Sequence, residues 1–187
     1  MSNAIFLILR ALWYMLPAYI ANPSAVLFRG KVPMDFGRNF VDGRRILGKG
    51  KTWRGFFGGI FGGVFVGMIQ NTISFFFPNE LFPTFSDNFF TAFLIILSLA
   101  SGSMLGDALG SFIKRRIGIE SGGKGFLLDQ WPFVFIAFLL TYIFFPDFFL
   151  YAFWNLPAII FILFITPLLH RLVNIVGYKM GKKEVPW

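Results

Sequence analysis

The sequence predicts an all-α, polytopic membrane protein with about five transmembrane helices, its N-terminus outside and its C-terminus in the cytoplasm. Hydrophobic residues make up 56% of the 187 positions, and phenylalanine alone contributes 28. This composition is typical of membrane-spanning proteins, and the length suits one domain, residues 1–187. The chain has no cysteine and one histidine, which excludes disulfides and thiolate or histidine-rich metal sites. Any bound metal would therefore be held by oxygen ligands.

Five apolar segments approach the roughly 20 residues that a helix needs to cross a hydrocarbon layer. They are Ala4–Ile20, Gly55–Phe77, Phe89–Ile113, Gln130–Phe145 and Phe148–Tyr178. The first has no basic leader and no small-residue cleavage site, so we expect a retained span rather than a signal peptide.

The first span contains one charged residue, Arg10, near its middle. Long basic side chains within a span either reach the interface or pair with an acid. We therefore consider three roles for Arg10: snorkelling, an ion pair with Asp107, and a place in a substrate cavity.

Glycine recurs every four residues in the second and third spans. The two ridges are Gly55, Gly59, Gly63 and Gly67, and Gly102, Gly106 and Gly110. Such ridges let helix backbones approach closely, within one bundle or between two copies. They predict close packing and leave the oligomeric state open.

The third span also carries a polar face, which hydrophobic matching alone would not produce. At about 100° per residue, one face holds Ser103, Asp107, Ser111 and Lys114. A carboxylate inside a span costs at least about 2.5 kcal/mol on insertion scales, so it marks a functional site.

The last two spans are shaped by proline. Pro132 suits the first turn of the fourth helix, with Asp129 near its cap. The fifth segment is long for one crossing, so we expect its end, beyond Leu169, to extend into the interface or the aqueous side.

Basic residues set the predicted orientation. Of 17 lysines and arginines, eight lie in 21–54, four in 114–124 and four in 171–183. The loops 78–88 and 146–148 have none. The positive-inside rule makes the basic side cytoplasmic, and the loops near 21–54 and 114–129 then form one active-site face. This face suits anionic lipid head groups, a polyphosphate, or both.

The loop before the second span has the ingredients of a phosphate site. Free N–H groups at a helix start, with lysines and arginines alongside, attract anions. The loop lacks the spacing and the preceding strand of a P-loop, and its alternative role is an anchor for lipid phosphates. The candidate nucleotide- and phosphate-binding residues are Arg44, Arg45, Lys49, Lys51, Thr52, Trp53 and Lys124. Trp53 could stack on a base or anchor the helix at the membrane interface.

Several carboxylates lie on the same predicted side. Two converging carboxylates beside phosphate-binding cations describe a Mg²⁺-nucleotide site, although acids among many cations are usually charge partners. Asp107 and Asp129 flank one loop and are our candidate metal ligands. The candidate catalytic residues are Asp107, Asp129, Lys114 and Arg115.

Two stretches resemble signatures of the membrane CDP-lipid synthase superfamily. Residues 50–59, Gly-Lys-Thr-Trp-Arg-Gly-Phe-Phe-Gly-Gly, are similar to its G-K-T-W-x-G-F-x-G-G stretch. The segment from Gly106-Asp107 through Lys114-Arg115 to Leu128-Asp129-Gln130 resembles a signature that ends in L-D-R-x-D. The closer resemblance, over nearly the whole chain, is to the archaeal branch, the CDP-archaeol synthases. It includes residues 33–37, 42–45, 166–170, Asn174 and the terminal Val185-Pro186-Trp187.

This resemblance implies a Mg²⁺-dependent cytidylyltransferase of the cell membrane, with its active site facing the cytoplasm. The implied reaction transfers CMP from CTP to an isoprenoid ether-linked glycerol phosphate, giving CDP-archaeol and pyrophosphate. The resemblance supports Asp107 and Asp129 at the metal and phosphates, and Lys114 and Arg115 on phosphate. The chain departs from the larger bacterial branch, however. The histidine of a P-G-H-G-G run is missing at 122–126, and the last carboxylate of L-D-R-x-D falls on Pro132. Asp35, Asp42 or Glu120 could supply the missing charge.

Two other classes compete with this interpretation. Asp42-Gly43-Arg44 is faintly similar to the motif of CDP-alcohol phosphotransferases, but the further acids of that motif are absent. A small transporter or channel would use Arg10 and Asp107 as a mid-membrane ion pair. No inverted repeat supports a transporter, and the polar residues gather at one face. No nucleic-acid partner is expected. Neither the base, the lipid linkage nor the number of metal ions follows from the residues alone.

Overall fold

The structure of the protein, a computed structural model, describes residues 3–181 and is entirely helical apart from its loops. The helices are α1 (Asn3–Leu27), α2 (Trp53–Phe76), α3 (Phe89–Arg116), the short 3-10 helix η1 (Phe126–Asp129), α4 (Trp131–Phe144), α5 (Pro146–Ala152) and α6 (Leu156–Lys179). Within the described residues the only β-type pairs are two isolated bridges. The predicted all-α fold is confirmed. The terminal motif at Val185 lies outside the described residues.

Four helices, α1, α2, α3 and α6, are long and apolar enough to cross a membrane. The predicted fourth span forms α4, which has 14 residues and therefore a length of about 21 Å, less than a hydrocarbon layer of about 30 Å. Its start is as expected, because Pro132 occupies the first turn, where its missing N–H is harmless.

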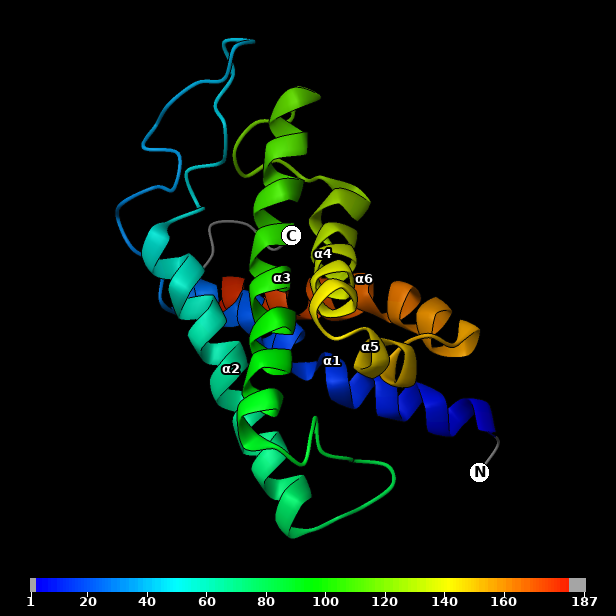
Figure 1. Cartoon of the computed structure of the whole chain (residues 1–187). Coiled ribbons are helices and arrows are strands. Elements are labelled where there is room, and N and C mark those ends of the chain that lie inside the picture. Colours follow the sequence, from blue (N-terminus) through cyan, green and yellow to red (C-terminus); the bar gives the residue numbers. More distant parts are fainter. Residues whose placement is uncertain (1–2, 182–187) are drawn as a thin grey trace.

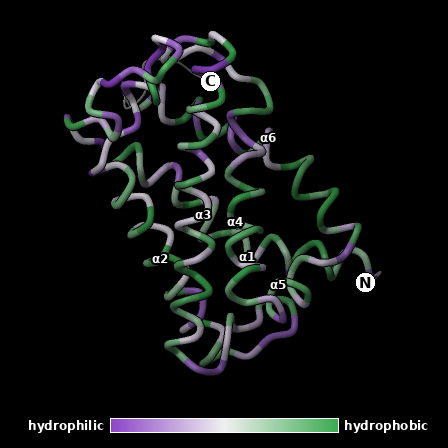
Figure 2. Tube along the Cα trace, turned by 45° about the horizontal axis from the view of Figure 1, so that its top comes forward, coloured by the Kyte–Doolittle hydropathy of each residue, from purple (hydrophilic) through white to green (hydrophobic). Residues whose placement is uncertain are grey.

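The helices α2, α3 and α4 lie side by side, and α1 and α6 run across them (Figure 1). The helix α3 contacts α1, α2 and α4, so it forms the centre of the bundle. Hydrophilic segments gather at the two ends of the molecule, with a mostly hydrophobic region between them (Figure 2). This is the pattern of a protein that spans a bilayer.

Both glycine ridges pack inside the bundle. A Cβ on Gly63 would lie 2.5 Å from the carbonyl oxygen of Pro17 in α1. A Cβ on Gly106 would lie 2.4 Å from the Cα of Phe133 in α4. The glycines therefore let α2 approach α1, and α3 approach α4, at backbone contact.

The predicted fifth span is not one helix, and the single segment Phe148–Tyr178 is wrong in this respect. It divides into α5 and α6. Asn155 begins α6, since its side chain accepts a hydrogen bond from the N–H of Ala158 at 3.0 Å. Pro157 follows in the first turn and has no N–H to continue the preceding helix.

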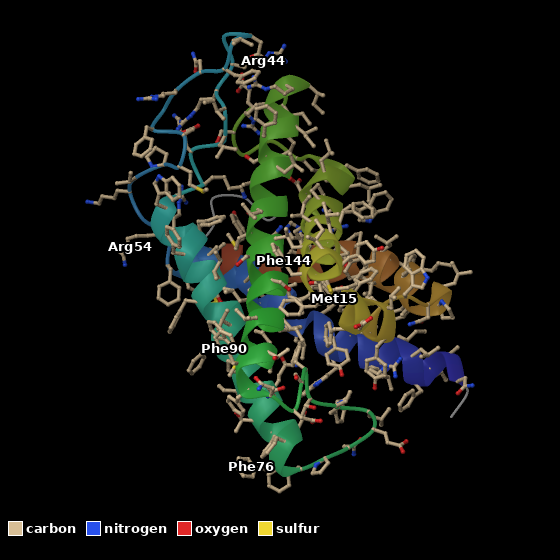
Figure 3. All side chains as sticks on the ribbon, viewed as in Figure 1. Met15, Arg44, Arg54, Phe76, Phe90 and Phe144 are labelled. Carbon is tan, nitrogen blue, oxygen red and sulfur yellow. The ribbon has the colours of Figure 1, made fainter. Side chains whose placement is uncertain are left out.

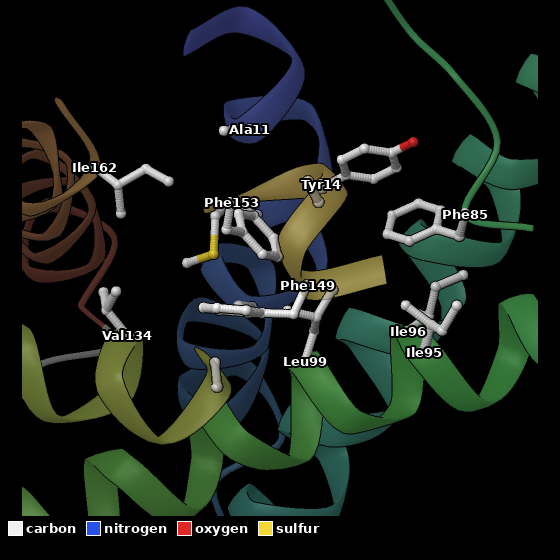
Figure 4. Close-up of a cluster of buried hydrophobic side chains, with 14 of the residues drawn as sticks. Ala11, Tyr14, Phe85, Ile95, Ile96, Leu99, Val134, Phe149, Phe153 and Ile162 are labelled. Atoms are coloured by element: carbon white, nitrogen blue, oxygen red, sulfur yellow. The ribbon is translucent and has the colours of Figure 1, made fainter. Parts of the chain in front are cut away.

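A cluster of buried aromatic and aliphatic side chains joins α1, α3, α4, α5 and the loop 77–88 (Figure 4). Tyr14 is its centre: the ring packs edge-on against Phe85 and Phe148, and the hydroxyl donates to the carbonyl of Thr84 at 2.9 Å. This core holds together the half of the bundle that lies away from the basic loop, so the other half is free to enclose a cavity.

Candidate active site

A cavity of about 1240 Å³ lies between α1, α2, α3 and α6 and is bordered by the loops after α1 and α3. Its charged lining residues are Arg29, Arg44, Arg45, Lys49, Lys51, Lys114, Arg115, Asp107, Glu120 and Asp129. Apolar side chains of α1 and α6 line the rest of it. The cavity is therefore large enough for a small organic ligand and strongly cationic on one side.

The basic loop, residues 28–52, is organised by the buried carboxylate of Asp35. Arg45 donates to both of its oxygens, at 2.7 and 3.0 Å, and the N–H groups of Gly37 and Leu47 donate at 3.0 Å. Burial alone would raise the pKa of Asp35, but these hydrogen bonds outweigh it and hold the pKa below its usual range. Asp35 does not line the cavity, so its negative charge is used within the loop.

Lys51 links the basic loop to the polar face of α3. Its ammonium lies 2.5 Å from an oxygen of Asp107. The next residue, Thr52, is the N-cap of α2: its hydroxyl oxygen accepts from the N–H groups of Gly55 and Gly30. Thr52 thus fixes the start of α2 and, through it, the place of Lys51.

Lys114 makes the equivalent ion pair with Asp129. The segment after α3 folds back along that helix, so that a Cβ on Gly110 would lie 2.5 Å from the carbonyl oxygen of Leu128. The second oxygen of Asp129 accepts from the N–H of Gly125 at 2.7 Å. Asp129 lies next to Gln130, the N-cap of α4, as predicted, but its carboxylate turns back to Gly125 and Lys114 and does not cap the helix.

Arg115 lines the cavity and has buried N–H groups that lack hydrogen-bond partners. It is 5% exposed, and its Nε and Nη1 have no hydrogen-bond partner. Buried N–H groups in native proteins are nearly always satisfied, and a guanidinium is suited to phosphate oxygens. The structure thus leaves two charged donors available beside the two lysine–aspartate pairs.

The backbone N–H groups of the basic loop are less available than predicted. Ser111 accepts from the N–H of Gly48 at 3.3 Å, and Ser121 accepts from the N–H of Lys49 at 3.0 Å. Because these amides are already bonded, an anion in this cavity would be held mainly by side chains.

Not every predicted nucleotide-site residue reaches the cavity. Trp53 and Lys124 are not among its lining residues. Trp53 stacks on Phe57, with ring centroids 5.9 Å apart, at the start of α2. Of its two predicted roles, this geometry favours the interface anchor. Arg44 does border the cavity, although its Nη1 donates to the carbonyl of Arg116 at 2.7 Å.

Sequence reasoning gave too little weight to polar residues of α1 and α6. Asn22, His170 and Asn174 all line the cavity. The amide of Asn174 and the Nδ1 atom of His170 are 3.1 Å apart. The available signal was their spacing of four residues, which puts two polar groups on one face of an apolar helix.

Arg10 lies outside the cavity lining. Its Nη2 donates to the carbonyl of Tyr151 at 2.8 Å, and its guanidinium lies 4.1 Å from the centroid of the Tyr151 ring. The predicted pair with Asp107 is therefore wrong, since Asp107 binds Lys51. Arg10 instead connects α1 to α5.

The donor set of the cavity fits a Mg²⁺-nucleotide complex better than a metal held by protein alone. Among the described residues, no group of three His, Cys, Asp or Glu side chains could hold a metal ion. Mg²⁺ in nucleotide enzymes is typically bound by one or two carboxylates together with substrate phosphates. Asp107 and Asp129, with cations beside them, supply that kind of partial shell.

Comparison with known proteins gives one consistent family. The family model described as CarS-like, CDP-archaeol synthase, matches residues 4–187. The CDP-archaeol synthase of Picrophilus torridus is 46% identical over 183 residues, 98% of each chain. That of Methanospirillum hungatei is 50% identical over 173 residues, 92% of this chain and all of the other. A solved structure, described as an intramembrane enzyme for archaeal membrane lipid biosynthesis, has a TM-score of 0.66 and 33% identity, covering 90% of this chain and 94% of the other.

Proposed function

The chain belongs to the CarS-like CDP-archaeol synthase family, multi-pass membrane enzymes of archaeal lipid biosynthesis, and on this basis we propose how its own cavity works. The proposed reaction transfers CMP from CTP to an isoprenoid ether-linked glycerol phosphate and releases pyrophosphate. The observation that carries this proposal is the meeting of two lysine–aspartate pairs and the unpartnered guanidinium of Arg115 in one cavity.

The cations would bind the triphosphate. Nucleotidyl transfer depends mainly on positioning and on neutralising charge, and it needs no covalent catalyst. Arg115 has two free donors, and Lys51 and Lys114 can exchange a carboxylate oxygen for a phosphate oxygen. Lys49 and Arg45 border the same cavity and add positive charge.

Asp107 and Asp129 would hold Mg²⁺, which would supply positive charge to neutralise the phosphates. Each carboxylate already faces an ammonium group, so each lies in surroundings that hold a cation beside it.

The acceptor would react without a general base. A phosphate monoester has a second pKa near 6, so its oxygen is already largely deprotonated at neutral pH. This suits a cavity whose only described histidine, His170, also interacts with Asn174. The apolar lining from Leu169, Leu172, Val173 and Val176 on α6 would receive the isoprenoid chains.

We further propose that the cavity faces the cytoplasm, where CTP is available. The support is the positive-inside rule, since the basic loop and the segment after α3 both border the cavity. The transporter alternative is not supported, because its Arg10–Asp107 pair is absent and the relatives are enzymes.

The test is incorporation of label from α-³²P-CTP into solvent-extractable lipid by the purified protein with Mg²⁺. The acceptors compared are archaeal ether-lipid phosphate, diacyl phosphatidate and none. We expect labelling that requires an acceptor, is greatest with the ether lipid and is lost with EDTA. Well-folded protein that labels no acceptor would overturn the proposal, and EDTA-resistant labelling would remove Mg²⁺ from it.

A further inference from the structure

Three charged residues, of which only Arg44 borders the cavity, fasten the basic loop to the end of α3. Arg116 Nη1 donates to Asp42 at 2.6 Å, and Arg116 Nη2 donates to the carbonyls of Arg45 at 2.6 Å and Arg44 at 3.3 Å. In the opposite direction, Arg44 Nη1 donates to the carbonyls of Arg116 at 2.7 Å and Arg115 at 3.4 Å. Each segment thus holds the backbone of the other. We call Asp42, Arg44 and Arg116 the loop latch.

The surroundings hold the latch in this geometry. The guanidinium of Arg116 lies against two aromatic rings, 4.8 Å from the centroid of Phe40 and 5.0 Å from that of Phe112. Asp42 also accepts from the N–H of Arg44 at 3.0 Å, which fixes the turn. The carbonyls that Arg44 binds belong to the last turn of α3, where a cation is favoured by the helix dipole. Figure 3 shows Arg44 at the end of the molecule where the loop meets α3.

The loop depends on such contacts because it has little regular structure of its own. Its backbone forms turns and the two isolated bridges Pro33–Thr52 and Asn39–Arg45, but no helix or strand. Yet it carries Arg45, Lys49 and Lys51 into the cavity. Within the cavity, the loop is also tied to α3 by the Lys51–Asp107 pair and by the longer bond from the Gly48 N–H to Ser111 at 3.3 Å.

We propose that Arg116 and Asp42 are positioning residues for the nucleotide site. Neither lines the cavity. They act through the loop, by holding Arg45, Lys49 and Lys51 at the distance from α3 that a bound triphosphate requires. This inference rests on the proposed function, because it assigns the loop cations to CTP.

The mechanism predicts a specific kinetic signature. A loosened loop must be ordered again each time CTP binds, so the apparent affinity for CTP falls. The reacting atoms, held by Asp107, Asp129 and Arg115 on α3 and η1, keep their geometry once CTP is bound. Breaking the latch should therefore raise the KM for CTP while changing kcat much less.

The test compares Arg116→Lys, Asp42→Asn and the double variant with Arg38→Gln. Lysine keeps the charge but lacks the planar, spread fork of N–H groups with which the guanidinium reaches Asp42 and the two carbonyls. Arg38→Gln is the matched control: it removes one positive charge from an exposed residue of the same loop that lies outside the cavity lining. Backbone hydrogen exchange of residues 29–52 is measured on the same samples without substrate.

We expect the KM for CTP to rise about tenfold in each latch variant, as for the loss of a charged hydrogen bond. In the double variant, the fold-increase in KM for CTP should not exceed the product of the two single-variant increases. Hydrogen exchange in 29–52 should accelerate in all three. Arg38→Gln should change neither KM nor exchange appreciably.

A KM for CTP that rises at least as much in Arg38→Gln, which removes a charge, as in Arg116→Lys, which keeps it, would overturn the proposal in favour of simple charge attraction. Unchanged hydrogen exchange, or a fall in kcat with unchanged KM, would also overturn it. These results differ from a failure of the proposed function, in which the wild-type protein itself transfers no CMP to lipid.

Discussion

At the scale of single residues, the cavity pairs each of its two central aspartates with a lysine from another segment. Asp107 on α3 binds Lys51 of the basic loop, and Asp129 on η1 binds Lys114 of α3. An unpaired charge in a low-dielectric interior would cost desolvation free energy. Each pair avoids that cost, because it gives both charges a partner. They also mean that a metal ion and an ammonium group compete for the same oxygens.

This competition predicts the effect of Lys51→Met. The variant should bind Mn²⁺, used as a probe for Mg²⁺, several-fold more tightly in the absence of nucleotide, because Asp107 loses its counterion. The same variant should bind CTP more weakly, because the triphosphate loses a cation. Titration of free Mn²⁺ by electron paramagnetic resonance and of CTP by calorimetry measures both effects.

Lys31→Met is the control for net charge, because Lys31 is exposed, lies on the same loop and does not line the cavity. Weaker Mn²⁺ binding by Lys51→Met than by this control would contradict the role assigned to Asp107.

The low pKa of Asp35 predicts how stability depends on pH. A carboxyl whose pKa is lower in the folded protein stabilises the fold above its unfolded pKa, about 3.9, and loses that effect as pH falls through the folded value. The thermal midpoint in detergent should therefore fall between pH 6 and pH 3. The thermal midpoint of Asp35→Asn should be lower than that of the wild-type protein at pH 6, and it should fall less between pH 6 and pH 3.

Asp87→Asn, which removes an exposed carboxylate from the opposite loop, should keep the fall seen in the wild-type protein. A wild-type pH dependence in Asp35→Asn would show that the carboxylate does not organise the loop.

Residue types and spacing selected Asp107 and Asp129, and the family resemblance added phosphate roles for Lys114 and Arg115; all four line the cavity. Spacing could not show that Lys51 reaches Asp107, because that contact joins residues 56 positions apart. It also could not show that Arg44 turns to carbonyl groups. Such partners depend on tertiary geometry, which local patterns do not contain.

At the scale of helices, the glycine ridges show why this bundle tolerates no side chain at certain contacts. Gly106→Ala would place a methyl group 2.3 Å from the carbonyl oxygen of Pro132 and 2.4 Å from the Cα of Phe133. Neither backbone atom can rotate away. We expect a loss of about 1–3 kcal/mol of stability, seen as a lower thermal midpoint in detergent.

Gly50→Ala provides the comparison, because a Cβ at Gly50 would meet nothing within 4 Å. Its thermal midpoint should match that of the wild-type protein. If Gly106→Ala were equally neutral, α3 and α4 would not be packed at backbone contact.

Hydrophobic length predicted the middle helices within a few residues, and it failed at the end of the chain. Between α5 and α6 the apolar character continues without interruption, so a hydropathy criterion sees one segment. The break depends on the cap at Asn155 and the proline two residues later. The N-cap and the proline therefore mark a helix boundary that a hydrophobicity criterion does not detect.

At the scale of the whole molecule, the two hydrophilic ends differ in charge. The end with the basic loop holds the cavity, and the loop 78–88 at the other end has no lysine or arginine. Sequence predicted this asymmetry because loop charge needs no tertiary information. It could not predict that the basic segments enclose a space, which requires α1 to pack against both α3 and α6.

The orientation can be tested with single cysteines, since the chain has none of its own. In intact cells, Glu80→Cys in the outer loop should react with an impermeant thiol reagent, and Arg38→Cys should react only after permeabilisation. Both residues are exposed. Labelling of Arg38→Cys from outside would reverse the proposed topology.

The segment after α3, which folds back along that helix, sets the depth of the chemistry. It brings Leu128, the residue before Asp129, against Gly110, about six residues or 9 Å along the helix from the last residue of α3. At that depth, the phosphate of a lipid can stay near its usual level in the bilayer while its chains stay among the helices. We therefore expect the water-soluble nucleotide to diffuse into the cavity, while the lipid substrate stays in the bilayer throughout the reaction.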